Sequence, residues 1–295
     1  MAIQRDSAQP GDGMAIKEAV ELLRVPAPTL RSWERRYGLP TTARSVGGHR
    51  RYTFDALNQL RLMRDEIAGG RPAADAARWV RGLLDDTNPA RKQIDAVLAA
   101  SKRRDAATIV SLLEQARSEL GLAGAIDDVL LPSVRQIGTW WEAGRCDVGQ
   151  EHFTTEVVRG WLAKMTTLGP PPMSDSWVLL AVGPRDLHTL GIECLAAVLV
   201  NQEVGCRVLG PRTPQRVLTA AIAATSPAAV VLVSHLATHR RAAVESIHAV
   251  AETDCPIFYA GNAFLFVSAR RNVPGAYLGE SVTAASRTIR AAINQ

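Results

Sequence analysis

From residue 177 onward, short apolar runs alternate with longer helix-like runs, and this alternation constrains the fold more than any other feature of the sequence. Continuous runs of Val and Leu are typical of strands buried on both faces of a parallel sheet, and the intervening helices complete βαβ units. We therefore predict an α/β domain over 177–295 with a flavodoxin-like (Rossmann-type) parallel sheet. Its expected strands are Val178–Val182, Val204–Gly210, Ala229–Ser234, Ile257–Tyr259 and, more weakly, Ala276–Leu278, and its expected helices include Thr189–Val200, Pro214–Thr225 and Thr238–Ala251.

The stretch Asp186-Leu187-His188-Thr189-Leu190-Gly191 follows the first of these apolar runs. It therefore lies in the loop after a buried strand, where such sheets bind their ligands. His188 can reach outward as a metal ligand, while Asp186 can hold the other ring nitrogen and fix the tautomer. Gly191 allows a bulky group to approach the backbone. The alternative is an ordinary turn that happens to contain these residues.

Length and composition limit the classes of protein that this chain can belong to. Its 295 residues are enough for two or three domains, and 47% hydrophobic with 21% charged residues is typical of a globular protein. No apolar run reaches the roughly 18 residues that span a membrane. The first 13 residues are polar and read as a disordered lead-in without a signal-peptide core. The four cysteines form no CxxC pair, which favours reduced thiols in a cytoplasm over a disulfide framework or a zinc site.

Positive charge is concentrated near the N-terminus. Between positions 24 and 51 the only acid is Glu34, and this local excess is larger than the net charge of +5 of the whole chain. An arginine-rich segment of this kind indicates a nucleic-acid binder, and the alternative is a solvated basic face. The arginines are Arg24, Arg31, Arg35, Arg36, Arg44, Arg50 and Arg51.

The same segment has the pattern of a helix-turn-helix. Ile16–Leu23 is a short amphipathic helix, a proline-containing turn follows, and Thr29–Tyr37 forms a second, basic helix with Leu30 and Trp33 facing inward. A basic second helix is expected to enter the major groove of DNA. Beyond it, Gly47-Gly48 predicts a hairpin turn, with residues 49–52 on the returning strand as a wing that contacts phosphates.

Two of these segments carry a family resemblance. Residues 29–38 (TLRSWERRYG) and 47–52 (GGHRRY) closely resemble the winged helix-turn-helix of MerR-type transcription regulators, over about residues 14–84. The resemblance implies dimers that bind double-stranded, palindromic operator DNA. Tyr37 and Tyr52 could instead be core aromatics. The DNA contacts that it implies are Arg31, Arg35, Arg36 and Tyr37 in the helix and His49, Arg50 and Tyr52 in the wing.

The residues that follow depart from the metal-sensing members of that family. Those members use one long helix for dimerisation, whereas here two helices, Phe54–Ile67 and Pro72–Leu84, are separated by Gly69-Gly70. After a polar boundary at residues 85–89, apolar residues recur at helical spacing over 91–168 and predict a four-helix bundle, with a junction near Gly121 and Gly124.

The connection between the third and fourth helices of this bundle is unusual. It contains Trp141 and the pair Glu151-His152, which suggest a ligand-facing end of the bundle. The alternative is a tryptophan packed on the bundle beside a solvated Glu-His pair.

The C-terminal motifs, taken together, resemble the cobalamin-binding domain. They are Asp186-x-His188-x-x-Gly191, Ser234-x-Leu236 and Ala260-Gly261, where the family usually has Gly-Gly. The resemblance implies that His188 is the lower cobalt ligand and that the nucleotide tail of the corrinoid descends beside the sheet, past the serine and the glycines. His235 and His239 are weaker ligand candidates, because no orienting acid lies near them in the sequence.

Trp141, nine intervening residues and Glu151-His152 resemble the signature of light-sensing regulators of the CarH/LitR type. The resemblance implies a helical bundle that caps adenosylcobalamin, with Trp141 and Glu151 around the adenosyl group and His152 able to ligate cobalt after light. It also implies tetramers that bind operator DNA in the dark. We therefore expect a cytoplasmic, light-responsive repressor with no enzymatic activity and no membrane association. The alternatives are a regulator with another ligand or without light sensing, and a corrinoid methyl-transfer module.

Overall fold

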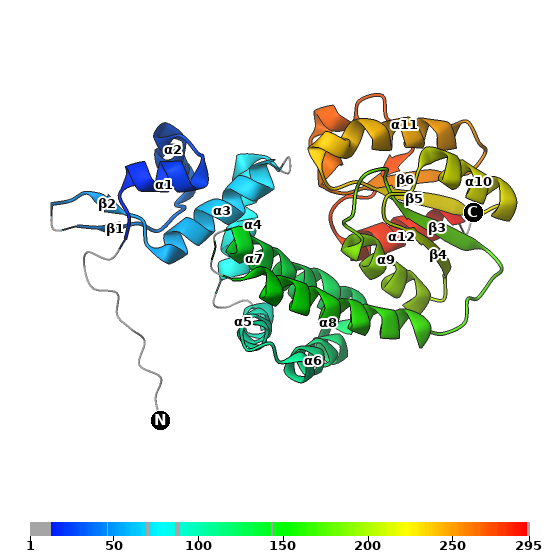
Figure 1. The fold of residues 1–295 in the computed structure, drawn as a ribbon, viewed down its shortest axis with the longest axis horizontal. Coiled ribbons are helices and arrows are strands. Elements are labelled where there is room, and N and C mark those ends of the chain that lie inside the picture. Colours follow the sequence, from blue (N-terminus) through cyan, green and yellow to red (C-terminus); the bar gives the residue numbers. More distant parts are fainter. Residues whose placement is uncertain are drawn as a thin grey trace. The chain divides into compact units, whose positions relative to one another are not determined.

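The computed structural model describes residues 13–45, 47–68, 71–85, 89–142, 144 and 146–293, and it divides into two compact units, 1–85 and 86–295 (Figure 1). The predicted disordered lead-in, except Gly13, and the Gly69-Gly70 separator lie outside the described residues. Within the described part of the chain, every helix is too short or too polar to span a bilayer.

The first unit is a helix-turn-helix followed by a hairpin and two further helices. The second helix begins at Ala27, two residues earlier than predicted, because Pro28 fits the first turn of a helix, and it ends at Gly38 in the left-handed conformation. Leu30 and Trp33 are buried as expected. The elements are α1 Ile16–Leu23, α2 Ala27–Tyr37, β1 Ala43–Arg44, β2 Arg50–Arg51, α3 Phe54–Ala68 and α4 Ala73–Leu84.

The predicted wing is present as an antiparallel hairpin. Arg44 is opposite Arg50 in the pairing of β1 with β2, and Gly48 has φ +76° in the turn. The returning strand is shorter than predicted, because Tyr52 pairs with Met14, ahead of α1, instead of with β1. The wing is therefore tied at its base to the start of the helix-turn-helix.

The second unit begins with the predicted helical bundle, which consists of α5 Pro89–Lys102, α6 Ala106–Gly124, α7 Leu131–Glu142 and α8 Val148–Thr167. Gly121, at φ +73°, interrupts the regular backbone near the end of α6, as the junction prediction required. A π-helix, Ala125–Leu130, joins α6 to α7 and was not predicted. Pro132 has no N–H group to continue a regular ladder, and the wider π turn lies directly before it.

The rest of this unit confirms the predicted parallel sheet, with strand order β4-β3-β5-β6-β7 and every neighbouring pair parallel. The first expected helix of this part, Thr189–Val200, is α9, but the last helix, α12, was not predicted. The elements are β3 Trp177–Val182, α9 Leu190–Asn201, β4 Gly205–Gly210, α10 Gln215–Thr225, β5 Ala229–Val233, α11 Arg240–Ala251, β6 Ile257–Ala260, β7 Ala276–Tyr277 and α12 Val282–Ile293, with 3-10 turns at Ala237–His239, Asn262–Phe264 and Val267–Arg270.

Helices cover both faces of the sheet, α10 and α11 on one side and α9 and α12 on the other (Figure 1). Leu179 and Ala181 of β3 face the core that α10 and α11 complete, whereas Leu180 faces the opposite core, which includes α9 and α12. Apolar side chains of α6 and α8, among them Trp161, belong to this second core as well. The bundle and the sheet therefore share one hydrophobic core, and they form a single compact unit.

Candidate functional site

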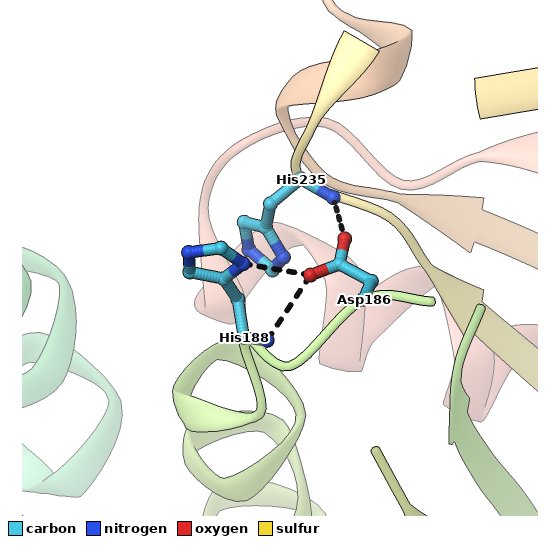
Figure 2. A group of neighbouring side chains, drawn as sticks. All are labelled: Asp186, His188 and His235. Atoms are coloured by element: carbon cyan, nitrogen blue, oxygen red, sulfur yellow. Dashed lines mark hydrogen bonds and ion pairs between the residues drawn. The ribbon is translucent and has the colours of Figure 1, made fainter. Parts of the chain in front are cut away.

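Asp186 is the centre of a polar cluster at the carboxyl ends of β3 and β5, and its side chain is 0% exposed. Its Oδ1 accepts hydrogen bonds from Nδ1 of His188 at 2.7 Å and from the backbone N–H of His188 at 3.1 Å. Its Oδ2 accepts the backbone N–H of His235 at 2.5 Å (Figure 2). The same oxygen lies 3.5 Å from the Ser234 hydroxyl, which donates to it. One buried carboxylate therefore organises both loops.

These hydrogen bonds shift the pKa values of Asp186 and His188 in opposite directions. Burial alone would raise the pKa of Asp186, but the hydrogen bonds from His188 and from the His235 backbone hold it far below its ordinary value. The hydrogen bond to Asp186 raises the pKa of His188. Because Nδ1 of His188 is used by Asp186, Nε2 is the nitrogen left to bind a ligand, and the side chain is 54% exposed. This is the arrangement by which proteins orient a metal-binding histidine.

The structure corrects the expectation that His235 has no acid beside it. Val182 and Val233 are paired in the sheet, so the loops after β3 and β5 meet, and the ligand atoms of Asp186, His188 and His235 all lie within 4.8 Å of one another. Burial lowers the pKa of His235 to about 4. Its Nδ1 is buried and has no hydrogen-bond partner among the described residues. The sequence signal was only that each of the two loops follows a predicted strand, because the sequence does not specify that β3 and β5 are neighbours in the sheet.

A cavity of about 310 Å³ opens beside this cluster. His188, Gly191 and His235 line it from the loops and α9, and Gly261 lines it from the end of β6. Two further walls come from α7, through Leu131, Val134 and Arg135, and from the start of α12, through Ser281, Val282 and Ala285. The cavity therefore lies between the sheet, the bundle and the last helix.

The three small residues of the motifs have different surroundings. Ser234 is 0% exposed, and its hydroxyl points to Asp186 rather than lining the cavity. Gly261 has φ +100°, and a Cβ there would overlap the Ser234 carbonyl oxygen. A Cβ on Gly191 would meet only the His235 ring, at 3.6 Å or more, which is ordinary contact. The backbone itself requires glycine at 261 but not at 191. Leu236, the other residue of the Ser234-x-Leu236 motif, is 42% exposed and is not among the residues that line the cavity.

The structure does not bring the predicted cap residues into this cavity. Trp141, at the end of α7, is 48% exposed. Glu151 and His152 lie in the first turn of α8, where Nε2 of His152 is 3.5 Å from Oε2 of Glu151 and the His152 side chain is 73% exposed. None of the three is among the residues that line the cavity, and neither is His239.

The start of α8 is nevertheless held firmly by residues that sequence reasoning missed. Asp147 caps α8 by accepting the N–H of Gln150 at 2.8 Å, and Arg104 donates to both oxygens of Asp147, at 2.9 and 2.7 Å. Buried Ser101 and Thr154 are 2.7 Å apart and also bind α5 to α8. These bonds hold the start of α8, which carries Glu151 and His152, against the end of α5 in this structure.

The basic surface of the first unit includes most of the predicted DNA contacts. Arg31, Arg35 and Arg36 are exposed on α2, Tyr37 is half-buried at its end, and His49 is exposed in the wing. A recess of about 370 Å³ lies between the wing and the start of α1, and Arg31, His49, Arg50 and Arg51 are among its lining residues.

Two predicted contacts have intramolecular roles in the structure. Tyr52 is 1% exposed, which supports the alternative that it is a core aromatic. Arg50 donates to Glu34 at 2.5 Å, and Thr42 donates to the same carboxylate at 2.6 Å. Burial would raise the pKa of Glu34, but these hydrogen bonds lower it. Glu34, which the sequence showed only as the single acid among the arginines, thus ties the wing to α2.

Two family descriptions match consecutive parts of the chain. Residues 14–83 match the MerR HTH family regulatory proteins, and residues 93–165 match a B12 binding domain. The monomethylamine corrinoid protein of Methanosarcina barkeri has a similar fold over 68% of this chain and 99% of its own length, with a TM-score of 0.52 and 15% identity.

Two curated relatives match most of the chain. The HTH-type transcriptional repressor CarH of Myxococcus xanthus is 32% identical over 72% of this chain and 75% of its own length. The repressor CarA of the same organism is 26% identical over 74% of this chain and 75% of its own length. The chain therefore belongs to the CarH-like family of MerR-type regulators that carry a B12 binding domain.

Proposed function

We propose that this protein is a cytoplasmic, light-responsive transcriptional repressor that binds adenosylcobalamin as its chromophore and operator DNA in the dark. The observation that carries the proposal is the Asp186–His188 pair, whose free Nε2 lies at a cavity in the same chain as an arginine-rich α2. The similarity to two transcriptional repressors supports the regulatory role.

The residues at the cavity suit a corrinoid. An imidazole nitrogen oriented by a buried carboxylate is a suitable ligand for a transition metal. A cavity of about 310 Å³ is at the lower end of the range for ligand pockets, so it would take a buried part of the ligand, such as its nucleotide tail. The small residues Gly191 and Ala260 leave space in this cavity, and the unpartnered Nδ1 of His235 would offer the nucleotide tail a polar contact. When bound, adenosylcobalamin would supply a light-sensitive cobalt–carbon bond.

In this proposal the chain's own residues have separate tasks. His188 would bind the cobalt of the cofactor through Nε2, and Asp186 holds its ring. Trp141 and Glu151 would surround the adenosyl group, and His152 would be the candidate cobalt ligand after light. The exposed positions of Trp141 and His152 mean that this arrangement requires a movement of the end of the bundle.

DNA binding in the proposal uses the first unit. Arg31, Arg35 and Arg36 of α2 read the operator, and the exposed His49 of the wing contacts its backbone. Tetramers present several such units at once, so the loss of assembly after light weakens DNA binding through lost multivalency. The cofactor acts by binding the assembled form more tightly than the dissociated form.

A test is available that separates the steps. Purified protein reconstituted with adenosylcobalamin in the dark should be red, elute as a tetramer and shift operator DNA in a gel. Green light should change its visible spectrum, reduce its size and release the DNA. His188→Ala should load cofactor weakly and retain little of it after light, whereas Arg241→Ala, a change at a 90% exposed side chain, should behave as wild type. A protein that stays colourless after reconstitution would contradict the proposal.

One observation favours a second candidate, a cobalamin-dependent regulator that does not respond to light. Trp141, Glu151 and His152 are not among the residues that line the cavity, so their contact with an upper ligand rests on resemblance. In this case the red protein would bind DNA equally in darkness and after green light. Equal binding, together with a stable visible spectrum, would therefore replace the first candidate with the second.

A further inference from the structure

Asp127 lies on the π-helix that joins α6 to α7, yet its carboxylate caps the last helix of the sheet domain. Its Oδ2 accepts the hydroxyl of Ser281 at 2.8 Å and the backbone N–H of Thr283 at 3.0 Å, and its Oδ1 accepts the N–H of Val282 at 2.8 Å. The Ser281 hydroxyl in turn accepts the N–H of Ala284 at 3.1 Å. Together the two side chains satisfy the first three N–H groups of α12.

This cap comes from far away in the sequence. The first N–H groups of a helix have no partner within it, and they carry partial positive charge that favours an anion. The capping side chain is usually that of the residue just before the helix. Here Ser281 has that place, but the carboxylate is supplied by Asp127, 154 positions earlier. The bond therefore fixes two separate parts of the chain to each other.

Those two parts lead into two walls of the cavity beside His188. Leu131 and Val134 line it from α7, which begins directly after the π-helix. Ser281 and Val282 line it from the start of α12. Asp127 thus connects the wall that belongs to the bundle with the wall that belongs to the sheet domain.

We propose that Asp127 is a positioning residue for the ligand cavity, because its bonds to Ser281, Val282 and Thr283 hold the α7 and α12 walls at the separation that fits the ligand. The proposal rests on the proposed function in taking that ligand to be a cobalamin. A wall that is held in place before binding loses less freedom when the ligand enters. Without the carboxylate, the first turn of α12 opens more often, and the ligand dissociates faster.

The experiment compares full-length wild type with Asp127→Ala, Ser281→Ala and a control, Asp128→Asn, at the exposed neighbouring acid of the same π-helix. Hydrogen–deuterium exchange of the ligand-free proteins measures how often the amides of residues 282–284 open. Dissociation of hydroxocobalamin, which has no light-sensitive alkyl group, is followed by visible absorbance with an excess of a competing cobalamin-binding protein.

We expect Asp127→Ala to increase both rates by about 2- to 30-fold, which is the range that capping contributions imply. Ser281→Ala removes one bond to Asp127 and the bond from Ala284, so we expect a smaller increase, and Asp128→Asn should match wild type. Equal spectra of the loaded proteins would show that His188 is undisturbed. If Asp127→Ala does not fold, Asp127→Asn, which keeps one acceptor oxygen, provides the same comparison without changing a residue that lines the cavity.

Two results overturn the inference while leaving the proposed function intact. Unchanged exchange at residues 282–284 would mean that Asp127 does not hold the wall. Faster exchange with unchanged dissociation would mean that the bond stabilises α12 without positioning the cavity. A wild-type protein that takes up no hydroxocobalamin would instead overturn the proposed function, and with it the claim that Asp127 slows the dissociation of cobalamin. The exchange rates at residues 282–284 would then still test whether Asp127 holds the start of α12.

Discussion

Two glycines of the cobalamin motifs are expected to respond in opposite ways to the same substitution. Gly261 has φ +100° and ψ 165°, a backbone conformation that is essentially restricted to glycine. A methyl group there would also overlap the carbonyl oxygen of Ser234, which accepts the N–H of Ala263 at 3.1 Å. Gly191 lies in the first turn of α9, and a methyl group there would meet only the ring of His235 at ordinary distance.

These surroundings set the expected magnitudes. Gly261→Ala costs about 1–3 kcal/mol for the backbone conformation alone, and displacement of Ser234 raises the total to at least about 3 kcal/mol. For a unit of this size that is a fall in Tm of at least roughly 6 °C. Gly191→Ala should stabilise α9 by about 0.5–1 kcal/mol. Its methyl group, however, enters the cavity, and overpacking of about 1–3 kcal/mol weakens cobalamin binding roughly 5- to 150-fold.

Thermal unfolding of the ligand-free proteins and titration with hydroxocobalamin measure the two effects separately. Gly261→Ala should lose stability before any ligand is added, whereas Gly191→Ala should keep its stability and lose affinity. The reasoning would be refuted by a Gly261→Ala protein as stable as wild type, or by a Gly191→Ala protein that binds hydroxocobalamin unchanged.

Three further predictions concern charge. Because burial lowers the pKa of His235 to about 4 from 6.5, the unfolded chain takes up this proton first, and stability should fall by about 2–3 kcal/mol as the pH drops from 6.5 toward 4. Urea midpoints at pH 7 and 4.5 measure this loss, and His235→Asn should abolish most of it. Arg35→Ala should weaken operator binding by about 1–3 kcal/mol if Arg35 reads a base, or reduce the salt slope if it contacts phosphate, and unchanged gel shifts at all salt concentrations would exclude both roles. Arg159→Ala removes the 2.8 Å bond from α8 to the buried Thr189 hydroxyl, next to His188, and should cost about 1 kcal/mol in urea unfolding, clearly more than Arg241→Ala.

Much of the secondary structure could be predicted because it depends on local pattern. Continuous apolar runs identified the five strands, and the helix-turn-helix followed from Pro28, Trp33 and the arginines around them. The π-helix and α12 were missed for different reasons. The apolar spacing of 125–130 also fits a regular helix, so the π-helix has no signal of its own. The start of α12 does have a local signal, since Ser281 caps it and Val282, Ala285 and Ile289 lie on one buried face, and only the cap from Asp127 comes from a distant segment.

The candidate site likewise contains contacts that could be predicted from the sequence and contacts that could not. Asp186 and His188 are two residues apart, so their contact depends on one loop and was predicted. The position of His235 against Asp186 depends on the neighbouring places of β3 and β5 in the sheet, which the sequence order does not specify. The burial of Tyr52 likewise depends on its pairing with Met14.

Sequence alone therefore determined the parts of this protein: a basic helix-turn-helix with a wing, a helical bundle, a parallel sheet and a histidine held by an aspartate in the loop after the first strand. These features arise from residues close together in the chain, where spacing fixes geometry. Only the tertiary structure decided which motif residues surround the cavity, that glycine at 261 serves the backbone and at 191 the open space, and that Asp127 joins the bundle to α12. Those relations arise from strand order and from packing across a shared core, which bring together residues up to 156 positions apart.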